Sequence, residues 1–250
     1  MTDLSAFSLE GKTIMVTGAN TGIGQGIAVA IARAGGAVVG VGRSDMRETA
    51  SLIGDAFTAI TSDLSDLDSA RDMLERAWAD QPIDGLVNNA GIIRRADAVD
   101  FTVDDWDAVL NVNLRTLFFL SQAYAKAVLS AGRAAKIVNI ASLLSFQGGI
   151  RVPAYTASKH AVAGVTQALS NEWAARGINV NAIAPGYIES NNTSALRADP
   201  ERSAAILSRI PAGRWGQPSD IGDAAVFLLS RASDYMHGAT IPVDGGWLAR

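Results

Sequence analysis

The sequence predicts an α/β fold: a single domain with a doubly wound parallel sheet of about seven strands and helices on both faces. Short apolar, β-rich runs alternate with helical stretches along all 250 residues, which is typical of parallel strands joined by crossover helices. The 24 glycines fit a chain with many tight strand-to-helix turns. No internal repeat, low-complexity tract or linker divides residues 1–250, so we expect one domain.

Composition excludes several classes of function. Hydrophobic residues make up 48% of the chain and charged residues 18%, enough for a sizeable core. The absence of cysteine rules out disulfides and thiolate metal sites, and the two histidines make a metal centre unexpected. A net charge of −4 gives no electrostatic reason to expect nucleic acid or a membrane as a partner. Because no signal peptide or membrane-spanning stretch is visible, we expect a soluble cytoplasmic protein.

The first expected strand, residues 12–17, leads directly into a glycine-rich turn. An Ala-rich helix is expected over residues 25–34. Strand, glycine turn and helix are the context of a dinucleotide-binding loop, in which the backbone approaches a pyrophosphate at the helix N-terminus. The spacing is G-x-x-x-G-x-G, and a glycine loop alone is also compatible with a purely structural turn. The expected cofactor contacts are Gly18, Asn20, Thr21, Gly22, Ile23 and Gly24.

The second strand, expected over residues 37–41, ends in Gly42-Arg43-Ser44. An acidic residue there would bind an adenosine ribose 2′-OH and disfavour a 2′-phosphate. Arg43 can bind a 2′-phosphate, or it can equally be a solvated loop arginine that stacks on adenine. Both NAD and NADP therefore remain open as the cofactor.

The third and fourth strands add further cofactor contacts. Residues 57–61 form the third strand, which is followed by Asp63 and Leu64. Asp63 is placed to accept a hydrogen bond from the adenine amino group, or to cap a helix expected over residues 67–79. The fourth strand, residues 83–88, is followed by three further expected contacts, Asn89, Ala90 and Gly91, of which the small Ala-Gly pair lets the cofactor lie close to the backbone.

A helical stretch expected over residues 103–131 carries Asn113 in an apolar setting. A buried amide needs a hydrogen-bond partner. Asn113 either satisfies backbone groups alone, for example where the helix opens locally, or it takes part in the chemistry.

The fifth strand, residues 136–141, leads to Ser142, and Tyr155 and Lys159 follow on a helix expected over residues 155–176. Residues four apart on a helix share one face. A neighbouring ammonium favours the phenolate and lowers the pKa of a phenol. A hydroxyl at the strand end can bind a substrate oxygen beside that phenol. These residue types are suited to moving a proton to or from a carbinol oxygen.

The helix over residues 155–176 is apolar beyond a single stripe, which predicts burial against both the sheet and another subunit. The chain then continues with a sixth strand over residues 178–184, Pro185-Gly186, a polar loop over 187–193, a mobile-looking helical segment over 194–209, a helix over 219–230 and a seventh strand over 240–243.

As a set, these motifs resemble the short-chain dehydrogenases/reductases over nearly the whole chain. The resemblance implies a Rossmann-type fold, an NAD(P)-linked alcohol/ketone reaction and usually a homotetramer. It implies that Tyr155 is the general acid/base, that Ser142 holds the reacting oxygen, and that Lys159 binds the nicotinamide ribose and lowers the pKa of Tyr155. Asn113 would anchor a water in a proton relay to Lys159. Further cofactor contacts are implied at Pro185, Gly186, Ile188 and Ser190, in addition to Tyr155 and Lys159.

The loops around the expected active site resemble those of family members that act on deoxy-keto sugar acids. A guanidinium can bind a sugar-acid carboxylate bidentately. The candidate substrate contacts are Arg94, Arg95 and Arg151 for the carboxylate, and Gln147, Asn191 and Asn192 for the hydroxyls. Each arginine can equally be surface charge, and Arg151 can pair across a subunit interface. A dehydrogenase for another polyol or a ketoacyl substrate, and a non-catalytic nucleotide-binding sensor, are the alternative functions.

Overall fold

A parallel sheet forms the centre of the computed structural model, which describes residues 4–250 apart from the side chain of Asn192. Within these residues the sheet has seven strands in the order β3-β2-β1-β4-β5-β6-β7, and every neighbouring pair is parallel. The strands are β1 (Thr13–Thr17), β2 (Ala37–Gly42), β3 (Phe57–Thr61), β4 (Gly85–Asn88), β5 (Ala135–Ile140), β6 (Ile178–Pro185) and β7 (Thr240–Val243). The predicted doubly wound α/β fold is confirmed.

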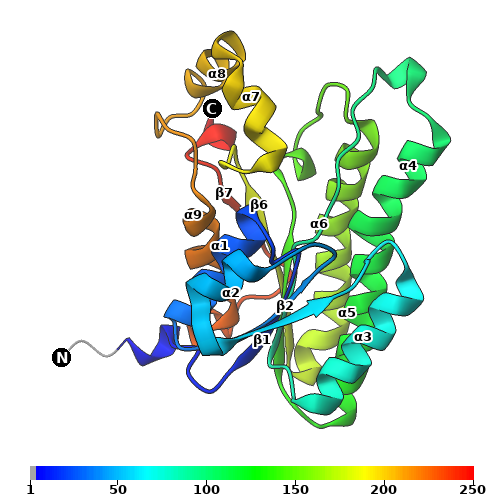
Figure 1. Ribbon diagram of the computed structural model, residues 1–250, viewed down its shortest axis with the longest axis vertical. Helices are drawn as coiled ribbons and strands as arrows, with labels where there is room; N and C mark the ends of the chain where they lie inside the picture. The colour runs from blue at the N-terminus through cyan, green and yellow to red at the C-terminus, as the bar shows by residue number, and fades with distance from the viewer. Residues whose placement is uncertain (1–3) are drawn as a thin grey trace.

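Helices cover both faces of this sheet (Figure 1). One face carries α1 (Gly22–Arg33), α2 (Arg47–Ile53) and α9 (Pro218–Leu229), and the other carries α3 (Leu67–Asp80), α4 (Val103–Leu110), α5 (Leu117–Ser130) and α6 (Pro153–Trp173). Two short helices, α7 (Ser194–Ala198) and α8 (Pro200–Leu207), stand above the carboxyl ends of the strands. No helix within residues 4–250 is long and apolar enough to cross a membrane.

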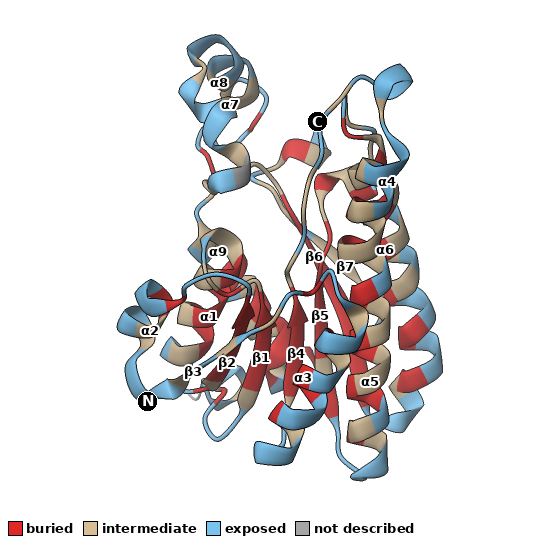
Figure 2. Ribbon diagram, turned by 45° about the vertical axis from the view of Figure 1, so that its right-hand side comes forward, coloured by how far each residue is buried: buried red, intermediate tan, exposed pale blue. Residues whose placement is uncertain are grey.

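The core follows from the apolar strands. All residues of β4 and β6 are buried, as expected for strands covered on both faces. Neighbouring residues of β1 pack into different clusters: Met15 lies in the core under α3, α5 and α6, and Ile14 and Val16 lie in the core under α1 and α9. Figure 2 shows the result, with a largely buried sheet and helices exposed on their outer surfaces.

Three local differences from the sequence prediction have clear causes. The helix α2 was not predicted because only Thr49 of its residues is buried, so it lacks an apolar stripe. The predicted helix over residues 194–209 is instead two helices, because Asp199 caps α8 and Pro200 opens it. The helix α6 begins at Pro153 rather than Tyr155, since proline is well suited to the first helical turn.

The capping role suggested for Asp63 is wrong. Asp66 is the N-cap of α3, and its carboxylate accepts hydrogen bonds from the backbone N–H groups of Asp68 and Ser69. Asp63 accepts instead from the backbone N–H of Ser65. The carboxylate of Asp63 therefore belongs to the loop after β3 and not to the helix end.

Candidate active site

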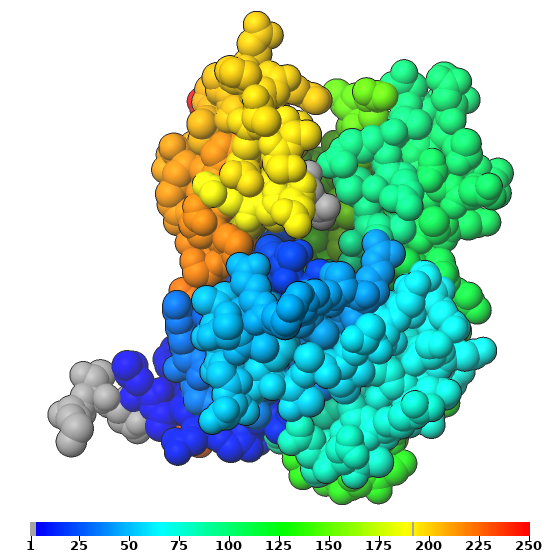
Figure 3. Space-filling view, in the orientation of Figure 1, coloured from blue at the N-terminus to red at the C-terminus, as the bar shows by residue number. Residues whose placement is uncertain are grey.

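A cleft of about 390 Å³ lies at the carboxyl edge of the sheet. The strand order reverses between β1 and β4, and ligands of open α/β sheets bind at such a switch point. Figure 3 shows a hollow between the yellow segment that includes α7 and the green segment that includes α4. Of the predicted cofactor contacts, those that line the cleft are Gly18, Asn20, Thr21, Gly22, Ile23, Gly24, Arg43, Asp63, Leu64, Asn89, Ala90, Gly91, Tyr155, Lys159 and Ser190.

Three predicted contacts do not line this cleft. Ile188 is 3% exposed and belongs to the hydrophobic core, and Gly186 packs tightly against Asp244. Pro185 is buried at the end of β6. Residues of the lining that the motifs did not indicate are Gly42, Ser44, Ser62, Ser65, Ile92, Val112 and Ile140. Most of them adjoin a predicted contact in the sequence, and that adjacency is the one signal that could have identified them.

The glycine turn leaves its backbone open to the cleft. Gly18 and Gly22 have φ values of +68° and +56°, a left-handed conformation that favours glycine. A Cβ at Gly24 would collide with the carbonyl oxygen of Gly18, which keeps the turn close to the start of α1. Thr21 makes no side-chain capping hydrogen bond, and the first turn of α1 has no acidic residue. These features fit a pyrophosphate bound by backbone N–H groups at the helix N-terminus.

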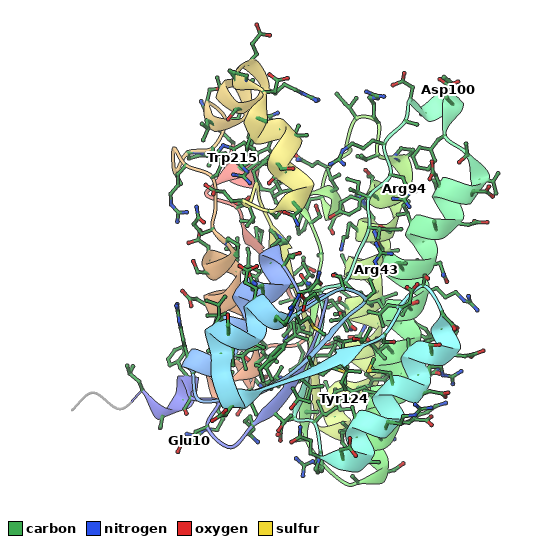
Figure 4. All side chains as sticks on the ribbon, in the orientation of Figure 1. Glu10, Arg43, Arg94, Asp100, Tyr124 and Trp215 are labelled. Atoms are coloured by element: carbon green, nitrogen blue, oxygen red, sulfur yellow. The ribbon has the colours of Figure 1, made fainter. Side chains whose placement is uncertain are left out.

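Hydrogen-bond donors gather at the end of β2. Asn20 Nδ2 donates to Ser44 Oγ at 2.7 Å, and both residues line the cleft beside Arg43. Figure 4 labels Arg43. Hydrogen bonds from Ser65 hold the pKa of Asp63 below its ordinary value, and the charge of Arg43 lowers it further. The donors at this end of the cleft fit an adenosine group that carries a phosphate.

Tyr155 and Lys159 lie one turn apart on α6, and both line the cleft. Lys159 Nζ lies 5.5 Å from the centroid of the Tyr155 ring and donates to the carbonyl oxygen of Ile140 at 2.6 Å. The Tyr155 side chain also makes a hydrogen bond with the side chain of Ser142. The structure thus brings the three predicted proton-handling residues together from the loop after β5 and from α6.

The pKa values of this group are set mainly by burial. Burial raises the pKa of Tyr155 above its ordinary value, although the Ser142 hydrogen bond and the charge of Arg95 act to lower it. Burial lowers the pKa of Lys159 to about 8. The predicted lowering of the Tyr155 pKa by Lys159 is therefore not seen, because burial has the largest effect on the phenol and raises its pKa. Tyr155 stays protonated at neutral pH, the form that can donate a proton.

Asn113 lies on a π-helical segment, Asn111–Thr116, that separates α4 from α5. Its side chain accepts from the backbone N–H of Ile92 at 2.8 Å and donates to the carbonyl of Ile92 at 2.9 Å. It also donates to Ser158 Oγ at 3.3 Å, which connects it to α6 next to Lys159. The expected helix over residues 103–131 therefore opens locally, and the buried amide satisfies backbone groups of the loop after β4.

The same π-helical segment also fastens the loop after β3. Asn111 Nδ2 donates to the carbonyl oxygen of Ser65 at 2.6 Å. Thr116 Oγ1 donates to the carbonyl oxygen of Leu64 at 2.8 Å. Side chains of one short segment thus position two of the loops that line the cleft.

The candidate substrate arginines differ in their surroundings. Arg94 pairs with Asp105 at 3.1 Å, and Arg151 pairs with Asp97 at 3.0 Å. Figure 4 places Arg94 on the side of the cleft that carries α4. Arg95 is exposed, and its charge acts on the phenol of Tyr155. Among these three, Arg95 is the arginine whose charge the structure ties to the proton-handling group.

The candidate hydroxyl-binding residues lie in two loops. Asn191 lines the cleft, and Gln147 is half-buried, with its backbone N–H bonded to the carbonyl of Leu143. The side chain of Asn192 lies outside the described part of the structure. Among the described residues, no group of three or more His, Cys, Asp or Glu side chains could hold a metal ion.

Comparison with known proteins places this fold and site in a family. Residues 18–248 match the family described as enoyl-(acyl carrier protein) reductase. The chain is 57% identical to 2-dehydro-3-deoxy-D-gluconate 5-dehydrogenase of Escherichia coli over 99% of each chain. It is also 57% identical to the enzyme of the same name from Bacillus subtilis over 98% of each chain.

Solved structures agree with this assignment. An Agrobacterium tumefaciens protein with bound NADP is 61% identical and has a TM-score of 0.94, with 98% of this chain and 99% of that one covered. A gluconate 5-dehydrogenase from Burkholderia cenocepacia in complex with NADP and tartrate is 37% identical, with a TM-score of 0.92 and 99% of each chain covered. On these full-length similarities and this fold, the chain belongs to the short-chain dehydrogenase/reductase family.

Proposed function

We propose that the protein transfers a hydride between NAD(P)(H) and a secondary alcohol or ketone of a deoxy-keto sugar acid. The observation that carries this proposal is the contact of Tyr155 with Ser142 and Lys159 beside the glycine-turn cleft. The relatives named 2-dehydro-3-deoxy-D-gluconate 5-dehydrogenase support the substrate class.

The proposed chemistry of the protein is proton transfer. Ser142 and Tyr155 would bind the substrate oxygen, and the bound cofactor, held by the glycine turn and by residues 89–91, supplies the hydride at its nicotinamide C4. In reduction, the Tyr155 phenol donates its proton to that oxygen as negative charge develops there. Lys159, whose pKa is about 8, then serves as the proton source for Tyr155. We propose that Asn113, which donates to Ser158 Oγ, anchors a water in this relay.

Initial rates with a panel of carbonyl compounds test this function. We expect the highest kcat/KM with keto-deoxy sugar acids, in the presence of NADPH or NADH. If NADPH is oxidised with other carbonyl compounds of the panel but with none of these acids, the substrate class is ruled out. Tight cofactor binding with no turnover of any alcohol or ketone would instead favour the non-catalytic sensor.

A ketoacyl reductase is the second candidate function, because the matching family is described as an enoyl-(acyl carrier protein) reductase. The charge of Arg95 next to Tyr155 favours a small anionic substrate over a long acyl chain. Including an acyl thioester in the panel separates the two functions. A higher kcat/KM for the thioester would favour the ketoacyl reductase.

We propose that Arg95 binds the substrate carboxylate. Arg95→Gln is expected to raise KM for the sugar acid about 10- to 100-fold with a small change in kcat, because a hydrogen bond to a charged group contributes about 1.5–3 kcal/mol. The matched control is Arg94→Gln, since Arg94 already pairs with Asp105. Equal effects of the two substitutions on KM would contradict the assignment.

We propose a preference for NADP over NAD, supported by Arg43, Ser44 and Asn20 at the end of β2. Arg43→Ala is expected to raise the Kd for NADPH about tenfold or more and to leave the Kd for NADH within about twofold. Fluorescence titration of each cofactor measures both constants. If Arg43 stacks on adenine instead, the two affinities will fall together.

We also propose that the protein is a cytoplasmic homotetramer. A hollow of about 420 Å³ lies between α5 and α6, and its lining includes the apolar side chains of Phe118, Leu129 and Trp173. This surface supports contact with a second copy of the chain. Light scattering of the purified protein gives the mass, and a monomer at micromolar concentration would contradict the assembly.

A further inference from the structure

Ser145 connects the end of β5 to helix α6. The residue is 8% exposed, and its Oγ donates to the carbonyl oxygen of Lys159 at 2.6 Å. A carbonyl oxygen has two lone pairs, so it can accept this bond in addition to the hydrogen bond of the helix. The bond joins the loop after β5 to the very residue whose ammonium lies over the Tyr155 ring.

The same loop holds Ser142. Residues 142–145, here called the serine turn, include one 3₁₀ turn, Leu143–Ser145, with Ser142 as its N-cap. Ser142 Oγ accepts from the backbone N–H of Leu144 at 3.1 Å, and its carbonyl accepts from the backbone N–H of Ser145 at 2.9 Å. The serine turn is thus a short hydrogen-bonded unit with Ser142 at one end and the bond to α6 at the other.

The opposite side of the serine turn has different neighbours. Leu143 packs with Ile210 and Trp247, in a cluster that also includes Ile206 and Leu207 of the segment above the cleft. A shift of that segment would therefore act on the serine turn. The bond from Ser145 resists such a shift, because it ties the turn to α6 and not to the segment above the cleft.

Alignment of Ser142 with Tyr155 matters because the two side chains come from different elements. Proton transfer needs hydrogen-bond contact between the reacting groups, and a displacement of about 1 Å can cost about 100-fold in rate. Ser142 lies in the loop after β5, whereas Tyr155 lies on α6. A direct bond between the serine turn and α6 keeps the two in register.

We propose that Ser145 is a positioning residue that holds Ser142 against Tyr155 by anchoring the serine turn on the carbonyl of Lys159. The inference rests on the proposed function and deepens it. Ser145 acts through Ser142 and is not itself a group that contacts the substrate. Because the Ser142 hydrogen bond lowers the pKa of Tyr155, loosening the turn raises that pKa.

A double-mutant cycle between Ser145→Ala and Ser142→Ala tests the proposal. In the wild-type background, Ser145→Ala is expected to lower kcat about tenfold or more, with KM and the Kd for NADPH within about twofold. In the Ser142→Ala background the same substitution is expected to change kcat less than about twofold, since the group it positions is gone. Equal fold losses in both backgrounds would overturn the proposal and leave Ser145 a merely structural role.

The matched control is Ser233→Ala. Ser233 is 1% exposed and donates to the carbonyl oxygen of Leu228 at 2.9 Å, far along the chain from the serine turn. Its removal deletes the same kind of buried hydroxyl–carbonyl bond and is expected to lower the melting temperature without changing kcat. A similar loss of kcat in this control would show that Ser145→Ala acts through general destabilisation.

Two further readouts keep the test decisive. Ser145→Ala is expected to move the pH profile of alcohol oxidation to higher pH, and Ser145→Thr is expected to restore the wild-type profile.

If Ser145→Ala fails to bind NADPH, Ser145→Cys replaces it, since the thiol fills the site and is only a weak donor. If the protein reduces no sugar acid, the proposed function fails, but a crystal structure of the variant still tests Ser145: an unchanged distance between Ser142 Oγ and Tyr155 Oη would overturn its role.

Discussion

Tyr155→Phe is expected to lower kcat for ketone reduction by about 10³-fold while NADPH still binds. General acid catalysis by a positioned side chain contributes about 10²–10⁴-fold, and the substitution removes the donated proton. The phenylalanine ring can keep its place beneath the Lys159 ammonium, which lies 5.5 Å from the ring centroid. Stopped-flow turnover and fluorescence titration of NADPH measure the two effects separately.

Tyr187→Phe is the matched control for this substitution. Tyr187 is half-buried and packs against Trp215 and Trp247, with ring centroids 5.7 and 4.7 Å away. Loss of its hydroxyl is expected to leave kcat within about twofold, because no proton transfer is assigned to it. A Tyr155→Phe variant with turnover within tenfold of the wild type would contradict the mechanism.

Lys159→Met is expected to lower kcat about 100-fold or more and, at the same time, to stabilise the folded protein at pH 7. Burial lowers the pKa of Lys159 from 10.5 to about 8. Burying the charged ammonium therefore reduces the free energy of unfolding by about 3 kcal/mol. The substitution also leaves the Ile140 carbonyl without its donor, at a cost of about 1 kcal/mol. The expected net gain in the free energy of unfolding is about 2 kcal/mol.

The pH dependence distinguishes this effect from ordinary repacking. The folded-state pKa of Lys159 lies below the unfolded value, so the unfolded chain binds more protons between about pH 8 and 10.5. Wild-type stability therefore rises over this range relative to Lys159→Met, and the advantage of the variant is full below pH 8 and shrinks above it. Urea unfolding at pH 7, 8 and 9.5 measures the difference.

The control for the pH series is Lys12→Met. The side chain of Lys12 is 52% exposed and pairs with Asp84, so its charge is already hydrated. The difference between this variant and the wild type shows what removal of an exposed ammonium does over the same pH range. A difference for Lys159→Met that changes with pH no more than the difference for Lys12→Met would show that Lys159 carries no pKa shift.

The strands of the sheet could be predicted from the sequence alone, because each strand is an apolar run bounded by turn residues. The strand β3 at Phe57–Thr61 and the strand β7 at Thr240–Val243 lie where they were predicted. Features that depend on a single cap were harder to predict, as at Asp199, which follows α7 and whose side chain caps α8. Pattern over several residues predicts an element, whereas local capping decides its ends.

The proton-handling residues were also predictable, since a four-residue spacing places Tyr155 and Lys159 on one helix face. The direction of the Tyr155 pKa shift was not predictable, because it depends on how deeply the fold buries the phenol. Sequence reasoning could not rank the candidate arginines either. Arg151 meets Asp97 across two loops that only the fold brings together.

The central claim is that the substrate ketone lies against Ser142 and Tyr155 while its carboxylate lies on Arg95. A crystal structure of Tyr155→Phe with NADPH and a keto-deoxy sugar acid tests it most directly, since the variant should hold the unreacted ketone. We predict a ketone oxygen about 2.6–3.2 Å from Ser142 Oγ, facing the ring position that lost its hydroxyl, and a carboxylate on the Arg95 guanidinium. A sugar acid bound the other way round, with its carboxylate at Ser142 and its ketone turned toward α7, would contradict the account.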